Sequence, residues 1–458
     1  MGKNSKIFAE EKIGKLLLRI SIPIIISFLV SELYNMVDTI FVGREVGGIG
    51  IGALVLVFPI QRIIIALSIM VAVGTSTAFS RANGQGNTEK ARKVIKNGYS
   101  LSALIMLTIT ILIYIFSEKI LIGLGASNQT LEYANSYLSI IIFGSIFLSL
   151  TTFISNIMVS LGNNKISIIS TSIGAIINII LDYILVVEFK MGIKGAAVAT
   201  TISQIIGFSY AYYHYSKVKK EYKITSGFEL DKKLILPIIL VGLSSFIIES
   251  EDGILMAVLN HLLLNSVGDN GIIVLGVISK VYMFLFITMF GIASAMQPIA
   301  AFNVGAKNYK RLKAVMYKTT IYAFITSAIM WVLVMIFAPQ IISIFVKEAE
   351  IIKESIIALR IMISVLPVVS IYYVSIFYFQ AMGKAKTSIL VAVLKQLLIM
   401  LPLSIILVRV FNLGALGVWI SYPISDILAS ISAYFLVKNE GIELSIKVNK
   451  QIEREKIA

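Results

Sequence analysis

The chain has 458 residues, of which 57% are hydrophobic and only 14% are charged. Soluble domains contain about 25% charged residues. With a mean hydropathy of +0.90, the composition therefore excludes an ordinary soluble domain. The net charge of +15 does not indicate nucleic-acid binding, because the basic residues lie between apolar runs, where membrane topology and anionic lipid account for them. The absence of cysteine excludes disulfides and thiolate metal sites.

Apolar runs close to the twenty residues that cross a bilayer recur along the whole chain. They predict an all-α polytopic membrane protein with twelve transmembrane helices. The predicted spans are 15–42, 51–78, 94–116, 133–160, 165–187, 194–215, 235–263, 270–301, 314–338, 355–381, 386–408 and 414–437.

The connections divide these spans into two lobes. A basic segment, 217–234, is predicted to be a cytoplasmic linker between an N-terminal six-helix lobe (1–216) and a C-terminal six-helix lobe (235–437), and 438–458 is predicted to be a cytoplasmic tail. Most Lys and Arg residues fall in the two termini and the even-numbered loops. The positive-inside rule then places both termini in the cytoplasm of a plasma-membrane protein.

The two lobes also repeat in sequence. Pro23 and Asp38 recur 214 residues later as Pro237 and Asp252, and Leu161-Gly-Asn-Asn-Lys165 resembles Met382-Gly-Lys-Ala-Lys386. Because each half has an even number of spans, both halves enter the membrane in the same sense. We expect two pseudo-symmetric lobes with a central cavity between them.

Polar residues of the N-terminal lobe gather at one depth. The predicted orientation puts Asp38, Asp182 and Thr200 in the outer half of three different spans, and Asn178 lies one turn from Asp182 on the same helix face. Intramembrane carboxylates are costly and mark ion or proton sites by default. Their oxygen donors suit Na⁺ or H⁺ better than a soft metal. The alternative is that the two acids only hydrogen-bond neighbouring helices.

Other polar residues are candidates for coupling the ion to a substrate. Tyr34 and Asn35 lie one turn from Asp38. In the C-terminal lobe, acids and lysines of both signs lie within spans, and we expect them to meet as a buried network. That network is either an interhelical brace or a second ion or substrate site. Its members are Glu249, Glu251, Asp252, Lys280, Lys395 and Asp426.

Several segments resemble the multidrug and toxic compound extrusion (MATE) family across nearly the whole chain. They are Val37-Asp-Thr-Ile-Phe-Val-Gly43, Leu161-Gly-Asn-Asn-Lys165, Asn178-Ile-Ile-Leu-Asp182, Gly195-Ala-Ala-Val-Ala-Thr200 and Gln297-Pro-Ile-Ala-Ala-Phe-Asn303. The resemblance implies two six-helix lobes, a V-shaped cavity, and a cation site at Asp38, Asn178, Asp182 and Thr200. Some family branches use a seventh-span Glu with a tenth-span Asp, but the tenth span here has no acid.

We therefore predict a secondary antiporter. It would export cationic or amphipathic drugs in exchange for Na⁺ or H⁺ by alternating access, as a monomer on the family's example and with no cofactor. A lipid-linked oligosaccharide flippase of the same superfamily is the alternative, and a non-transporting receptor or scaffold would need a sizeable extramembrane domain. No nucleophile–base pair or metal constellation indicates an enzyme.

Overall fold

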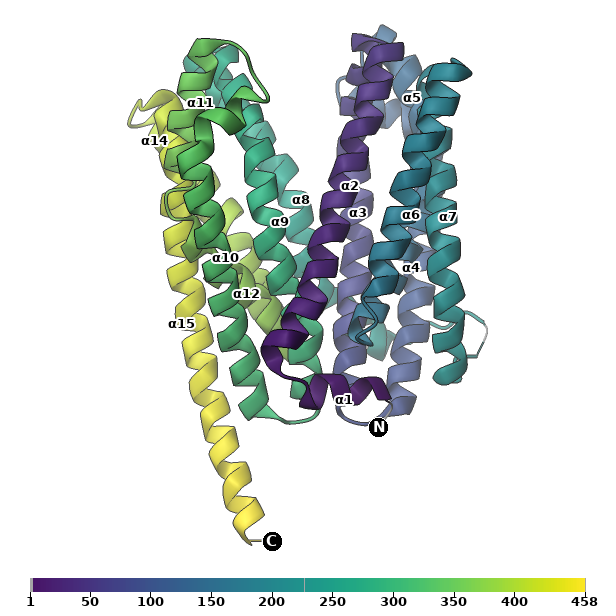
Figure 1. Ribbon diagram of the computed structural model, residues 1–458, viewed down its shortest axis with the longest axis vertical. Helices are drawn as coiled ribbons and strands as arrows, with labels where there is room; N and C mark the ends of the chain where they lie inside the picture. The colour runs from purple at the N-terminus through teal and green to yellow at the C-terminus, as the bar shows by residue number, and fades with distance from the viewer. Residues whose placement is uncertain (1–2, 226, 458) are drawn as a thin grey trace. The chain divides into compact units, whose positions relative to one another are not determined.

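The computed structural model describes residues 3–225 and 227–457, without the side chains of residues 3–6, 35, 252, 269 and 442–457. This part of the chain is almost entirely helical, which confirms the all-α prediction (Figure 1). Its helices are α1 (Lys3–Glu10), α2 (Ile13–Glu45), α3 (Gly48–Gly84), α4 (Thr88–Gly123), α5 (Asn128–Ser160), α6 (Lys165–Asp182), η1 (Tyr183–Glu188), α7 (Gly192–Glu221), α8 (Lys232–Val267), α9 (Asp269–Gly305), α10 (Tyr309–Ser343), α11 (Ala349–Met362), α12 (Leu366–Met382), α13 (Ala385–Val393), η2 (Leu394–Met400), α14 (Leu401–Arg409) and α15 (Gly414–Ile457).

Each predicted span coincides with helical structure, but the number of crossings is only partly confirmed. Among the described residues, ten helical segments are long and apolar enough to cross a membrane, or eleven if α11 and α12, which meet at a 54° bend, count as one. The predicted sixth span, now α7, is not among them. Its sequence is rich in Gly, Ser, Thr and Tyr, which lowers its hydropathy.

The helices extend beyond the apolar segments that predicted them. For example, α4 covers Thr88–Gly123 where the prediction was 94–116. Its N-cap is Asn87, whose side chain accepts a hydrogen bond from the Lys90 backbone N–H at 2.9 Å. Side-chain caps of this kind satisfy the first free N–H groups of a helix. Helices can therefore start in polar sequence that hydropathy assigns to a loop. Similarly, α15 continues as one helix from Gly414 to Ile457, through the predicted tail.

The chain forms two compact units, and their boundaries differ from those of the predicted lobes. Unit 1 contains Met1–Ile7 and Ile22–Glu249, and unit 2 contains Phe8–Ser21 and Ser250–Ala458. Thus α2 begins in unit 2 and continues in unit 1, while α8 begins in unit 1 and continues in unit 2.

Glycines explain why the first half of α8 belongs to unit 1. A Cβ atom on Gly242 of α8 would lie 1.9 Å from the backbone oxygen of Met70, and a Cβ on Gly74 of α3 would lie 2.0 Å from the backbone oxygen of Ile238. The two helices therefore cross with their backbones in contact, as small residues allow in membrane helix pairs.

Hydrogen bonds to the backbone hold the segment that begins at Phe8 in unit 2. The Phe8 carbonyl accepts hydrogen bonds from Arg311 Nε at 2.9 Å and from Asn303 Nδ2 at 3.4 Å. Arg311 also donates to the carbonyl of Glu11, and the Phe8 ring packs 5.7 Å from that of Phe302. One guanidinium therefore ties two carbonyls near the start of the chain to α10.

The linker between α7 and α8 is held against α4. Asn97 is fully buried, accepts a hydrogen bond from the Asp231 backbone N–H, and donates to Glu229 at 3.3 Å. The Glu229 backbone N–H donates to Ser100, and the Glu229 carboxylate pairs with Lys96 at 3.1 Å. Asn97 is thus the central contact of the linker.

Replacing Asn97 by Ala is expected to release the linker, because it leaves the Asp231 N–H and the Glu229 side chain without this partner. Limited trypsin digestion should then cut after Lys223 several times faster than in the wild type. Asn163→Ala, at an exposed loop residue, is the control and should leave the rate unchanged. Equal digestion of Asn97→Ala and wild type would contradict the role given to Asn97.

Candidate functional site

Four helices of unit 1 carry the predicted cation-site residues and one additional partner. Asp38 lies on α2, Asn178 and Asp182 on α6, Thr200 on α7 and Tyr137 on α5. Asp182 is the last residue of α6, and the chain continues directly into η1, a π-helical turn. Such turns are rare and often occur at functional sites.

Hydrogen bonds join these residues in two pairs. Asn178 Nδ2 donates to the Thr200 hydroxyl at 3.2 Å, and the Tyr137 hydroxyl donates to Asp38 Oδ2 at 3.4 Å. Gln61 on α3 lies near the Tyr137 side chain. The predicted residues of α6 and α7 are therefore in direct contact, and Asp38 is held by a tyrosine from a fourth helix.

Electrostatic interaction connects the two pairs. Asp38 and Asp182 are close enough to interact with each other, and both interact with Tyr34 and Tyr137. Asp182 is fully buried and Asp38 is 7% exposed. Two carboxylates that interact in a dry environment repel each other, so the arrangement favours a bound positive charge.

Several oxygens of this cluster have no hydrogen-bond donor among the described residues. They are both carboxylate oxygens of Asp182, Oδ1 of Asp38 and Oδ1 of Asn178. The alternative reading, in which the acids only hydrogen-bond neighbouring helices, does not account for Asp182. Buried carboxylate, amide and hydroxyl oxygens are the donors that a hard monovalent cation prefers, so the residues present fit Na⁺ as well as a proton.

Two candidates and one unpredicted residue complete the description of this cluster. The Tyr34 side chain is half-buried, whereas the side chain of Asn35 lies outside the described residues. Tyr137 was not predicted as a site residue, because a tyrosine in an apolar span has no sequence signal that separates it from a packing residue. Arg62, next to Gln61 on α3, pairs with Glu32 at 3.5 Å.

The charge network expected in the C-terminal lobe is only partly present. Lys395 and Asp426 form a buried ion pair, with Nζ 2.8 Å from Oδ1. Glu251 is buried, and Glu249 is half-buried. The expectation is wrong for Lys280, whose side chain is exposed, because Lys280 falls on a face of α9 that does not point into the helix packing. The side chain of Asp252 lies outside the described residues.

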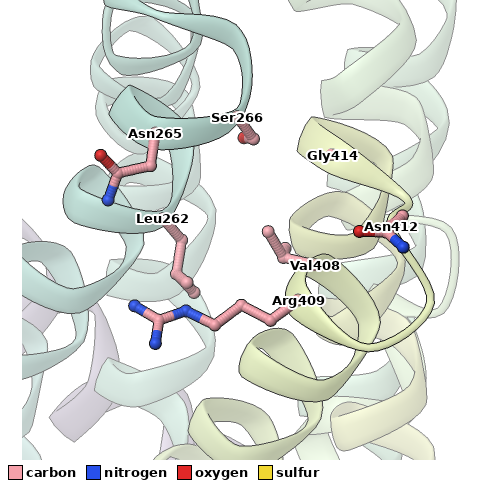
Figure 2. Close-up of a pocket in the computed structure, with 7 residues that line it drawn as sticks. All are labelled: Leu262, Asn265, Ser266, Val408, Arg409, Asn412 and Gly414. Atoms are coloured by element: carbon pink, nitrogen blue, oxygen red, sulfur yellow. The ribbon is translucent and has the colours of Figure 1, made fainter.

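A separate pocket lies at one end of unit 2, with a volume of about 420 Å³. In Figure 2 the Arg409 side chain extends from α14 toward Leu262 of α8. The pocket contains none of the predicted site residues. Its lining residues are Leu262, Asn265, Ser266, Val408, Arg409, Asn412 and Gly414.

Comparison with known proteins identifies the family. The family model described as MatE matches residues 23–184 and 242–406, which together are most of the chain. The chain belongs to the MatE family. This result confirms the resemblance to MATE proteins. The first matched segment contains Asp38, Asn178 and Asp182, and the second contains Glu251 and Lys395.

Curated MatE relatives cover the chain almost completely. Multidrug export protein MepA of Staphylococcus saprophyticus is 26% identical over 435 residues, which are 94% of each chain. A protein of Shewanella oneidensis named FAD transporter is 24% identical over 443 residues, 93% of this chain and 94% of that protein. Proteins named for different substrates are therefore similar to this MatE chain at the same level.

Solved structures are similar over the same length. A crystal structure of MATE in complex with MaD3S has a TM-score of 0.91 and 26% identity, and it covers 97% of this chain and 99% of that one. A MOP superfamily transporter from Pyrococcus furiosus, whose structure is described as having a binding pocket of reverse polarity, has a TM-score of 0.89 and 26% identity, with the same coverage. The fold of this chain is that of MATE transporters.

Proposed function

We propose that the protein is a secondary antiporter that exports organic cations or amphipathic drugs in exchange for Na⁺ or H⁺. The observation that carries this proposal is the buried Asp182 carboxylate, which accepts no hydrogen bond from the described residues and interacts with Asp38. A buried charge that the protein itself leaves without a donor is costly. A bound cation or proton removes that cost.

Family membership supports transport as the general activity, and the name of the Staphylococcus saprophyticus relative supports drug export. The comparisons do not favour the lipid-linked oligosaccharide flippase. In the proposed cycle, the ion enters the cluster of Asp38, Asn178, Asp182 and Thr200 from outside. The drug leaves from the same outward-open state, and the empty transporter returns with new drug. Coupling requires that ion and drug stabilise different states.

The bias of Lys and Arg toward the termini and even-numbered loops supports a plasma-membrane protein with both termini in the cytoplasm. All residues of the proposed ion site belong to unit 1, which supports a monomer as the transporting form.

Purified protein in liposomes tests the proposal. Ethidium transport should follow an imposed Na⁺ gradient, an imposed pH gradient, or both, and should be absent without a gradient. The gradient that drives transport identifies the coupling ion. FAD, named for the Shewanella oneidensis relative, serves as a second substrate. If neither ethidium nor FAD is transported under either gradient, the proposal is contradicted. If only FAD is transported, the proposed substrate class of organic cations is wrong.

A further inference from the structure

A lysine ammonium lies buried in the apolar interior of unit 2. Lys395 is part of η2, the second π-helical turn of the described chain, and is 2% exposed. Its Nζ lies 2.8 Å from Oδ1 of Asp426, which is itself 1% exposed. A buried charge persists only when it is paired, so Asp426 keeps the ammonium in place.

Aromatic rings complete the surroundings of this ammonium. Nζ lies 5.5 Å from the ring centre of Tyr373, 5.7 Å from that of Tyr372 and 5.9 Å from that of Tyr282. It also donates to the Tyr282 hydroxyl at 3.3 Å. Cations within about 6 Å of aromatic centres are attracted by the rings, and cages of this kind recognise ammonium ligands. Lys395 therefore occupies, as part of the chain, what is chemically an organic-ammonium site, called here the ammonium cage (Tyr282, Tyr372, Tyr373 and Asp426).

A second buried acid lies near the ammonium cage. Glu251 is 2% exposed and acts electrostatically on Tyr372, one of the three cage rings. Carboxylates near the cage favour a cation over an anionic group there.

A row of aromatic side chains leads to the ammonium cage along α9. Tyr282, Phe286 and Phe290 are spaced four residues apart, so they share one helix face. The rings of Phe286 and Tyr373 are 5.2 Å apart, and those of Phe286 and Phe290 are 5.0 Å apart. Tyr282 and Phe286 are only half-buried. The cage therefore continues along α9 as a row of aromatic faces, which are surfaces that attract cations.

We propose that the ammonium cage is a substrate site for primary alkylammonium groups, and that a substrate binds by replacing the Lys395 ammonium on Asp426. Lys395 is then an internal competitor that neutralises the site when no substrate is present. This inference rests on the proposed function, since it assigns a cationic substrate class to the exporter. No bond is made or broken. One ammonium leaves Asp426 as another takes its position.

Binding of dansylcadaverine, a fluorescent primary alkylammonium, tests this proposal by fluorescence anisotropy with the full-length protein in detergent. Lys395→Met removes the competing charge and keeps an apolar side chain, so dansylcadaverine should bind about tenfold more tightly, which equals about 1.4 kcal/mol. Lys395→Met combined with Asp426→Asn should bind more weakly than the wild type. N-acetylated dansylcadaverine, which lacks the charge, should not distinguish the variants.

Equal or weaker binding of dansylcadaverine by folded Lys395→Met would overturn the proposal, because a purely structural ion pair predicts no gain. Since breaking a buried pair can unfold a protein, a second pair of variants leaves Lys395 in place. Tyr282→Leu removes a cage ring and should weaken binding several-fold, whereas Tyr282→Phe keeps the ring and should not. Equal affinities of these two variants would also overturn it. Wild-type transport under ion gradients tests the proposed function separately, because binding in detergent requires no gradient.

Discussion

Replacing Asp182 by Asn is expected to reduce ion-driven ethidium transport to the level of protein-free liposomes. The amide keeps the shape of the side chain but removes the negative charge that would hold Na⁺ or a proton. Neither carboxylate oxygen of Asp182 accepts a hydrogen bond from the described residues, so the substitution breaks no such bond. The melting temperature should therefore stay equal or rise, because an uncompensated buried charge is removed.

Loss of transport together with an equal or higher melting temperature separates a coupling role of Asp182 from a structural one. If this carboxylate stabilised the fold, its replacement would lower both the transport rate and the melting temperature of the protein. Glu188→Gln is the matched control, since Glu188 is exposed at the end of η1 and accepts a hydrogen bond from Tyr183 at 2.8 Å. It should transport like the wild type. Full gradient-driven transport by Asp182→Asn would exclude Asp182 from the ion site.

Asp38→Asn should also abolish transport, but with a different effect on stability. Asp38 accepts a hydrogen bond from Tyr137, and an amide oxygen accepts it more weakly than a carboxylate. The melting temperature of Asp38→Asn should therefore be lower than that of Asp182→Asn. Tyr137→Phe, which removes only the donor, should weaken transport without abolishing it.

Replacing Gly242 by Val is expected to prevent stable folding. The Cβ atom of any larger residue would lie 1.9 Å from the Met70 backbone oxygen, and backbone cannot rotate away as a side chain can. Overpacking of a well-packed interior typically costs about 1–3 kcal/mol and sometimes more. The variant should elute as aggregate in fluorescence-detected size-exclusion chromatography, or melt far below the wild type.

Gly253 provides the control for this prediction, since it lies on the same helix and a Cβ there would meet nothing within 4 Å. Gly253→Val should elute as a single folded species. Folding of Gly242→Val with an unchanged melting temperature would show that α3 and α8 do not cross in backbone contact.

The sequence by itself determined the helical membrane fold, the positions of the helices and the internal repeat. These follow from local properties: apolar runs set where helices lie, and charged or capping residues set roughly where they stop. The candidate ion residues were also accessible from sequence, because a carboxylate within an apolar run is exceptional, as at Asp38 and Asp182. Asn178 follows from Asp182 by helical spacing alone.

Only the tertiary structure decided which side chains meet and which helices contribute residues to both units. Tyr137 is unremarkable as a single letter in its span, yet it donates to Asp38, and only the structure shows that Lys395 pairs with Asp426. Lys280 looked equivalent to Lys395 in sequence but is exposed. The physical reason is that hydropathy reports whether a segment enters the membrane. The rotation and crossing of each helix, which orient its polar residues, depend on close packing against distant segments, as at Gly74 and Gly242.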